Sequence, residues 1–317
     1  MMSSLKLLFE NARNIAILPH DSIDGDALCS SAALAEFAKS FGKRADIIFD
    51  DDIPVNLKFL NVPLLKSGEC TKKYDTVIAA DCGDAERTGE RKRFFDKAAH
   101  TAVIDHHVTN EGFGDINIIK PHSSSTCEIV FDIFRENGIC PDMRAAEFIY
   151  GGMLTDTGGF RYSNTSADTL FKAAELLKLG VPAAKLCEKL LETKTLSQLK
   201  IESAAVDSAV SFDGGRTLIA CITKEMIEKC GASDGEMGGI SSVLRTVAGV
   251  ETSVTLKEKD EKIRVSMRTN GKVSAAEVCR AFGGGGHERA AGATLSCTMD
   301  EALNAVIEEI HSYERNN

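Results

Sequence analysis

The sequence lacks any pair of cysteines at the Cys-x-x-Cys spacing, although ten cysteines are scattered along its 317 residues. Zinc ribbons and dithiol redox sites use that spacing, so neither class of site is indicated. Disulfide frameworks concentrate in small secreted domains, and we therefore expect these cysteines to be reduced. Cys127, Cys221 and Cys279 stand among apolar neighbours, which is typical of small core residues.

The sequence also has no apolar run close to the roughly 18 residues that a membrane-spanning helix needs. Its first ten residues lack the long apolar core and the cleavage site of a secretory signal peptide. No internal repeat and no low-complexity tract is visible. These absences predict a cytoplasmic protein without a membrane partner.

Positive charge is scarce as well. The chain has 37 Lys and Arg against 47 Asp and Glu, a formal net charge of −10. This balance argues against a surface that coats nucleic acid generally. It leaves room for a polyanionic substrate, because bound cations and a few local Arg or His residues can reverse the potential at one site.

The first half of the sequence alternates apolar runs with amphipathic helical segments. The expected elements are strands at 15–18, 45–49, 76–80 and 101–104 and a helix at 27–41. This βαβ rhythm predicts an α/β fold with a largely parallel sheet and helices on both faces. Further helices are expected at 126–136, 144–154, 167–179, 182–191 and 196–209.

The length exceeds the usual size of one domain, so we expect two domains. We predict an N-terminal domain at 1–190, a helical linker at 191–210 and a smaller α/β domain at 211–317, with a cleft between the domains. The smaller domain should contain strands at 217–223, 250–256 and 263–267, a turn at 257–262, and helices at 273–282 and 299–313.

Acidic residues and histidines follow four apolar segments of the N-terminal domain. Because parallel strands present their carboxyl ends along one edge of the sheet, we expect these side chains to converge there. They are His20, Asp24 and Asp26 after the first strand, Asp81 after 76–80, Asp105, His106 and His107 at the end of 101–104, and Asp156 after 151–155.

Ordinary structural roles compete with a shared site. The aspartates before the helix at 27–41 suit an N-cap, Asp81 suits a turn, and Asp156 suits a loop. His106 and His107 are harder to explain in this way, because Asp105 beside them provides a partner that orients a ligand. Carboxylates and imidazoles together favour a divalent transition metal.

Ser123-Ser124-Ser125-Thr126 precedes the expected helix at 126–136. We expect these residues to cap that helix, because Ser and Thr are favoured at N-caps. A helix N-terminus close to the predicted site could also meet a phosphate, so this alternative stays open.

These motifs, in this order, resemble the DHH phosphoesterase superfamily. Asp105-His106-His107 matches its signature, and Gly283-Gly284-Gly285-Gly286-His287 is similar to its DHH-associated substrate domain. Length and the GGGGH form resemble the group of nanoRNases and pAp phosphatases. Ile23 and Cys29 stand where the family often has Pro and Gly, and neither position supplies a ligand.

The resemblance implies two manganese ions, with magnesium or cobalt as substitutes. One ion would be held by His20, Asp24 and Asp81. The other would be held by Asp26, Asp81, His106 and Asp156, so that Asp81 bridges the pair. The expected catalytic residues are Asp81, Asp105 and His107, with Asp105 orienting a ligand and His107 facing the substrate phosphate.

The glycine run predicts an anion-binding segment, because four glycines expose backbone N–H groups and permit positive φ. Arg268 and His287 could add donors. A flexible linker is the alternative, and the small residues at 290–292, which suggest close packing, argue against it. The expected substrate-binding residues are His107, Arg268, Gly284, Gly285, Gly286 and His287.

The function that the resemblance implies is hydrolysis of short oligonucleotides to mononucleotides and of 3'-phosphoadenosine 5'-phosphate (pAp) to AMP. The alternatives are a cyclic-dinucleotide or linear-dinucleotide phosphodiesterase, a RecJ-like single-strand exonuclease, a family-II pyrophosphatase and a silent nucleotide-binding protein. The sensor, membrane or nucleic-acid-binding domains of the larger enzymes are not visible in this sequence. The oligomeric state is open, a homodimer included.

Overall fold

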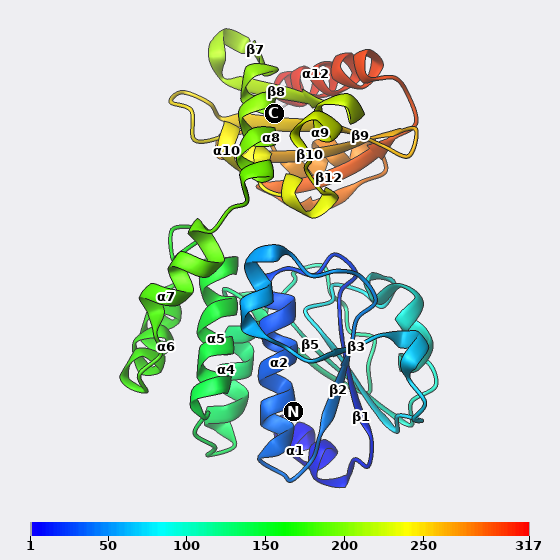
Figure 1. Ribbon diagram of the computed structural model, residues 1–317, viewed down its shortest axis with the longest axis vertical. Coiled ribbons are helices and arrows are strands. Elements are labelled where there is room, and N and C mark those ends of the chain that lie inside the picture. The colour runs from blue at the N-terminus through cyan, green and yellow to red at the C-terminus, as the bar shows by residue number, and fades with distance from the viewer. Residues whose placement is uncertain (1, 317) are drawn as a thin grey trace. The chain divides into compact units, whose positions relative to one another are not determined.

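The computed structural model describes residues 2–316 and divides into two compact units, Met1–Thr193 and Lys194–Asn317 (Figure 1). Each unit has its own sheet, so the predicted α/β fold with a parallel N-terminal sheet and a second domain is confirmed. Helix α8 (Leu196–Asp207), within the expected linker, counts with the second unit. The predicted roles of the two domains stay predictions.

The first unit contains a six-stranded, fully parallel sheet in the order β3-β2-β1-β4-β5-β6. Its strands are β1 (Ile15–Pro19), β2 (Ala45–Ile48), β3 (Leu64–Leu65), β4 (Thr76–Ala80), β5 (His100–Asp105) and β6 (Ile116–Ile119). Strands β3 and β6 were not predicted; β3 has only two residues, too few to establish a pattern.

Helices pack on the sheet as the alternating sequence predicted. Helices α2 (Gly25–Lys39), α4 (Thr126–Glu136) and α5 (Met143–Asp156) lie together on one side of it (Figure 1). Residues of β1 alternate between two cores, because successive side chains of a strand point to opposite faces. Ile15 and Ile17 join the core under these helices, whereas Ala16 and Leu18 join a second core.

Further helices complete the first unit. They are α1 (Met2–Asn11), α3 (Lys92–Phe95), α6 (Ala167–Lys178) and α7 (Ala183–Cys187), with a π-helical turn at Glu188–Glu192 and 3-10 turns at Val55–Leu60, Ser67–Glu69 and Glu86–Arg91. None of the helices within residues 2–316 combines the length and hydropathy that crossing a membrane requires.

The strand order reverses beside β1. The chain runs outward from β1 through β2 and β3, then returns to place β4 on the other side of β1. Pro19 pairs with Ala80, and Ala80 pairs with Ile104, so the residues that follow these three positions lie at one edge. Open α/β sheets bind ligands at the carboxyl ends of strands beside such a reversal.

Asp156 reaches this edge from a helix. The prediction that the helix ends at Leu154 and leaves Asp156 in a loop was wrong, because α5 continues through Asp156. The segment 151–155 is accordingly helical. Gly151 and Gly152 lie inside α5, as they do in the predicted helix, and they let neighbouring helices approach, as described below.

The second unit contains a mixed sheet in the order β11-β12-β10-β9-β8-β7, in which only β8 and β9 pair in parallel. Its strands are β7 (Val210–Phe212), β8 (Thr217–Ile222), β9 (Thr252–Lys259), β10 (Lys262–Thr269), β11 (Gly285–His287) and β12 (Ala290–Leu295). Besides α8, its helices are α9 (Lys224–Cys230), α10 (Ile240–Leu244), α11 (Ala275–Ala281) and α12 (Met299–Asn316), with 3-10 turns at Asp213–Gly215 and Asp234–Met237.

The turn between β9 and β10 is tighter than the predicted 257–262. Only Asp260 and Glu261 connect the strands, with φ of 47° and 59°. Positive φ at both central residues is typical of a two-residue hairpin turn whose twist matches that of the strands. The charged run therefore lengthens both strands.

The last two residues of the glycine run belong to the edge strand β11, and Gly284 packs against β12, so the flexible-linker alternative is wrong. A Cβ at Gly284 would lie 2.2 Å from the carbonyl oxygen of Gly292, and one at Gly286 would lie 2.5 Å from that of Ala290. Glycine is required where backbones approach so closely. Gly285 faces open space instead, with no atom within 4 Å of a Cβ there.

Candidate metal centre

His20, Asp24 and Asp81 form the first group of candidate ligands. Asp24 caps α2, since its Oδ1 accepts a hydrogen bond from the N–H of Ala27 at 3.0 Å. Its Oδ2 lies 3.8 Å from His20 Nε2, which is 3.7 Å from Asp81 Oδ2. Capping and metal binding therefore use different oxygens of Asp24, and the two expected roles are compatible.

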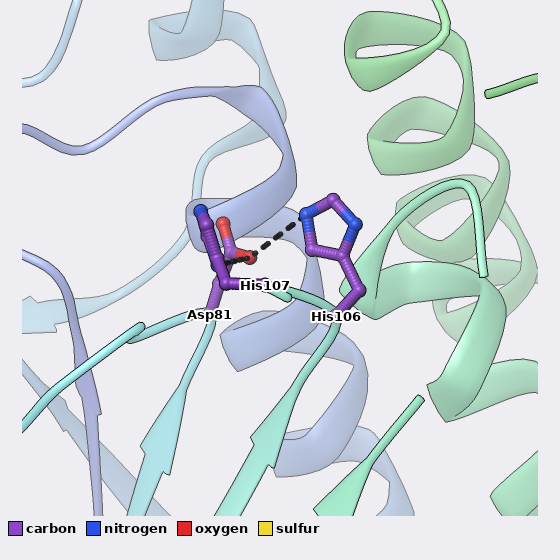
Figure 2. A group of neighbouring side chains, drawn as sticks. All are labelled: Asp81, His106 and His107. Atoms are coloured by element: carbon purple, nitrogen blue, oxygen red, sulfur yellow. Dashed lines mark ion pairs between the residues drawn. The ribbon is translucent and has the colours of Figure 1, made fainter. Parts of the chain in front are cut away.

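Asp26, His106 and Asp156 form a second group. His106 Nε2 lies 3.6 Å from Asp81 Oδ1 (Figure 2). It also lies 3.6 Å from Asp156 Oδ2. The two oxygens of Asp81 thus face different histidines, one from each group. His106 Nδ1 lies 3.3 Å from the carbonyl oxygen of Ser123, a contact that holds the proton on Nδ1 and directs the Nε2 lone pair toward the carboxylates.

His107 stands beside the same carboxylate, with Nδ1 3.9 Å from Asp81 Oδ1 (Figure 2). The same nitrogen is 2.7 Å from Oδ1 of Asp105, a fully buried side chain. Asn110 Nδ2 donates to Asp105 Oδ2 at 2.7 Å and to the carbonyl oxygen of Cys82 at 2.9 Å. Asn110 orients Asp105, and nothing in its loop sequence indicated this role.

Asp81 has a backbone conformation that L-residues rarely adopt, with φ of 59°. Its N–H donates to the carbonyl oxygen of Ile104, the residue paired with Ala80 on the next strand. A non-glycine residue in the left-handed region costs of order 1–3 kcal/mol, and such residues cluster at functional sites. The turn directs the Asp81 side chain between His20 and His106.

The electrostatics of the cluster favour a cation. Asp26 and Asp81 are only 1% and 2% exposed. Burial, reinforced by the Asp81 charge, raises the pKa of Asp26 to about 7. Burial and neighbouring carboxylates also raise the pKa of Asp81 and of Asp156. Burial opposes the charged form of His106, but Asp81 and Asp26 outweigh it and raise its pKa.

The donor set fits a divalent ion. Several carboxylates that share one buried site cannot all ionise without nearby positive charge. Buried charges are normally paired or coordinate a metal. Oxygen donors together with imidazole nitrogens suit manganese and similar transition ions. Asp81, His106 and His107 form a third group whose donor atoms lie close together. The seven side chains that can supply these donors are His20, Asp24, Asp26, Asp81, His106, His107 and Asp156.

Two glycines allow the helices around this site to meet. A Cβ at Gly152 would lie 2.2 Å from Cys127 Sγ and 2.7 Å from Asp26 Oδ1. A Cβ at Gly25 would lie 2.4 Å from Thr155 Oγ1. The close approach of α5 to α2 and α4 therefore depends on both glycines, and it brings the end of α5 to the site.

Gly152→Ala is expected to lower the free energy of unfolding by roughly 1–3 kcal/mol, because the added methyl group overpacks this contact. Metal affinity should fall as well, since Asp26 must move. Denaturant unfolding and metal titration check both effects. Gly151→Ala is the matched control, because its Cβ would meet side-chain atoms at 3.3 Å and alanine favours a helix. Equal losses in the two variants would contradict this account.

In the second unit, two predicted substrate-binding residues lie at one level of the sheet. Arg268 of β10 pairs with Ala290 of β12, and Ala290 pairs with His287 of β11. Directly paired residues project from the same face, so Arg268 and His287 flank a small alanine there. Gly284 and Gly286 are accounted for by packing against β12. The role of all these residues in substrate binding stays a prediction.

Comparisons with known proteins define the class. Residues 14–153 match the DHH family, N-terminal domain, and residues 217–315 match the DHHA1 domain. The chain belongs to the DHH family and is a hydrolase of its phosphoesterase class. The resemblance stated from the sequence is confirmed.

Within the family, the chain is 34% identical over 300 residues to the bifunctional oligoribonuclease and PAP phosphatase NrnA of Thermus thermophilus. That alignment covers 93% of this chain and 89% of the relative. An exopolyphosphatase-related protein from Bacteroides fragilis has a similar structure, with a TM-score of 0.92 and 28% identity over 99% of this chain and 96% of that one. RecJ from T. thermophilus in complex with Mn²⁺ shares the fold, with a TM-score of 0.58 and 14% identity over 100% of this chain and 54% of that one.

Proposed function

We propose that this enzyme hydrolyses short oligonucleotides to mononucleotides and pAp to AMP, using a pair of divalent cations, with manganese as the preferred ion. The observation that carries the proposal is Asp81, whose two oxygens face the two candidate ligand groups. The relative from T. thermophilus is named for both activities.

In this proposal, His20, Asp24 and Asp81 hold one ion, and Asp26, Asp81, His106 and Asp156 hold the other. When bound, such a pair activates water and neutralises charge on the phosphate. This accounts for a chain of net charge −10 that binds polyanions. The carboxylates would otherwise repel the substrate.

His107 is the proposed proton donor. Burial opposes its charged form, but the hydrogen bond to Asp105 outweighs burial and raises the pKa of His107. Nδ1 of His107 is hydrogen-bonded to Asp105. Nε2 is therefore the nitrogen that can donate a proton to a phosphoryl or leaving-group oxygen. Asn110 keeps Asp105 in place for this task.

The test of the function is a parallel assay of metal-stripped protein, resupplied with Mn²⁺, Mg²⁺ or Co²⁺. The substrates are pAp, a labelled dinucleotide, a 24-mer and cyclic di-AMP. We expect turnover of pAp and the dinucleotide with Mn²⁺, with kcat/KM at least roughly 100-fold below theirs for the 24-mer and for cyclic di-AMP. Preference for the 24-mer would indicate a RecJ-like exonuclease, and preference for cyclic di-AMP a cyclic-dinucleotide phosphodiesterase.

Arg268→Ala and His287→Ala are each expected to raise KM for the dinucleotide about 10-fold with little change in kcat. A charge-assisted hydrogen bond to substrate is worth roughly 1.5–3 kcal/mol, and losing uniform binding affects KM alone. Steady-state kinetics check this. Arg264→Ala, an exposed arginine four residues earlier on β10, is the control and should leave KM unchanged. Unchanged KM in both test variants would remove these residues from the substrate site.

A further inference from the structure

The first turn of α4 contacts the candidate ligands from behind. Thr126 Oγ1 donates to Asp81 Oδ1 at 2.8 Å, and the Thr126 N–H donates to Asp26 Oδ2 at 2.6 Å. The N–H of Cys127 donates to Asp26 Oδ1 at 3.0 Å. Thr126 is fully buried. One residue thus holds a carboxylate from each of the two candidate ligand groups.

These contacts decide between the alternatives for 123–126. Ser125 caps α4 as expected, with Oγ accepting from the Glu128 N–H at 3.0 Å. The N–H groups of the next two residues, Thr126 and Cys127, donate hydrogen bonds to Asp26. We therefore do not expect a phosphate to bind at this helix N-terminus, because the carboxylate of Asp26 already accepts hydrogen bonds from its N–H groups.

A buried ion cluster stands behind the same turn. Lys172 of α6, 2% exposed, places Nζ 2.9 Å from Glu128 Oε1 and 3.1 Å from Asp132 Oδ2, both on α4. Glu128 Oε2 in turn accepts from Ser124, from its N–H at 2.9 Å and its hydroxyl at 2.6 Å. The cluster thus connects α6 to the segment that leads into Thr126.

Buried ion pairs of this kind are poor sources of stability, because removing two charges from water offsets their attraction. They do hold a backbone segment in one arrangement when every polar atom is satisfied. Neither Glu128 nor Lys172 has a part in the chemistry described above. Their location points to a supporting role for the turn that holds Asp26 and Asp81.

We propose that Thr126 is a positioning residue for metal binding, acting through Asp81 and Asp26, and that Glu128 and Lys172 hold it in place. The proposal rests on the proposed function only in taking Asp26 and Asp81 as metal ligands. As the first residue of α4, Thr126 has no preceding helical carbonyl to accept its hydroxyl proton. Asp81 is therefore the acceptor, and the bond stops its carboxylate from rotating away from the two histidines.

Thr126→Val tests the hydroxyl alone, because valine keeps the shape and the backbone N–H to Asp26. We expect Mn²⁺ affinity, measured by calorimetry on full-length metal-stripped protein without substrate, to fall about 10- to 100-fold. Thr126→Ser restores a hydroxyl and should bind close to wild type. Wild-type affinity in Thr126→Val, or no recovery in Thr126→Ser, would overturn the proposal.

The ion cluster is tested by the double variant Glu128→Gln with Lys172→Met, which leaves neither of these two charges buried alone. Its Mn²⁺ affinity should also fall by about 10-fold or more. Lys120→Met is the control, because Lys120 pairs with Asp132 at 3.0 Å but makes no ion pair with Glu128. A folded double variant with wild-type Mn²⁺ affinity would remove the cluster from the proposal.

These titrations are independent of substrate. If wild-type protein binds Mn²⁺ but hydrolyses neither pAp nor the dinucleotide, the proposed function fails while the role of Thr126 is still judged by ion affinity. If hydrolysis occurs and Thr126→Val binds Mn²⁺ normally, the role of Thr126 fails alone. Melting of the metal-free variants separates a lost fold from a lost ligand arrangement.

Discussion

Replacing Asp81 by asparagine is expected to abolish hydrolysis of pAp and of dinucleotides, with a loss in kcat of at least roughly 10³-fold. Its two oxygens face His20 and His106, one from each candidate group. An amide replaces one anionic oxygen by an N–H donor, which cannot coordinate a cation. The substitution therefore weakens both proposed ion sites in a single variant. The measurement is kcat at saturating Mn²⁺, together with metal content.

Asparagine is preferable to alanine here because it tolerates the left-handed backbone of Asp81. The fold should survive, since burial disfavours the charged form of Asp81, and melting without metal should show no loss. Asp24→Asn is the graded comparison, because Asp24 belongs to one group only and its Oδ1 caps a helix. Full activity of Asp81→Asn with Mn²⁺ would refute the bridging role.

Much of the fold and of this cluster could be predicted because the signals are local. His20 and Asp81 directly follow mostly apolar segments of five residues that form fully buried strands. Parallel pairing then places them at one edge, since Pro19 and Ala80 are partners. The sequence indicates both the strand and the polar residue that follows it. The geometry of a parallel sheet then determines that these polar residues lie close together.

The roles of Thr126 and Asn110 were missed. Thr126 reaches Asp81 from a segment 45 residues away, and Asn110 reaches back five residues to Asp105 from the loop after β5. In sequence, both look like any polar residue in a cap or loop. The left-handed backbone of Asp81 has no signature either, because aspartate adopts that conformation only where the surrounding strands impose it. Supporting contacts therefore need coordinates, whereas candidate ligands do not.

The position of Asp156 at the end of α5 also depends on packing that the sequence does not show. The predicted helix, 144–154, contained Gly151 and Gly152 but stopped two residues early, because Thr155-Asp156-Thr157-Gly158-Gly159 passes as an ordinary loop in sequence. Gly151 and Gly152 let α5 lie against Cys29, Cys127 and Asp26, a demand that only the packed structure reveals. Asp156 was recognised as a candidate ligand and its helix was predicted, but the helix was ended two residues before Asp156.

Without metal, the free energy of unfolding is expected to fall as pH rises from 5 through 7. Burial raises the pKa of Asp26 from 3.8 to about 7, so in this window the folded protein holds a proton that the unfolded chain has lost. Stability falls with pH wherever the folded state binds more protons. The raised pKa values of Asp81, Asp156 and His106 act in the same direction.

The carboxyl groups whose pKa is lowered, such as Asp234 at about 2, have the opposite effect, but only below about pH 4, outside this window.

Mn²⁺ should reverse this fall of stability with pH. It binds the deprotonated ligands of the folded state, so its stabilisation grows with pH and reaches about 2.7 kcal/mol at 100 times its dissociation constant. Urea unfolding from pH 5 to 8, with and without Mn²⁺, measures both slopes. Asp26→Asn should flatten the metal-free slope, and a metal-free protein whose stability rises over this range would show that these carboxylates do not share a buried site.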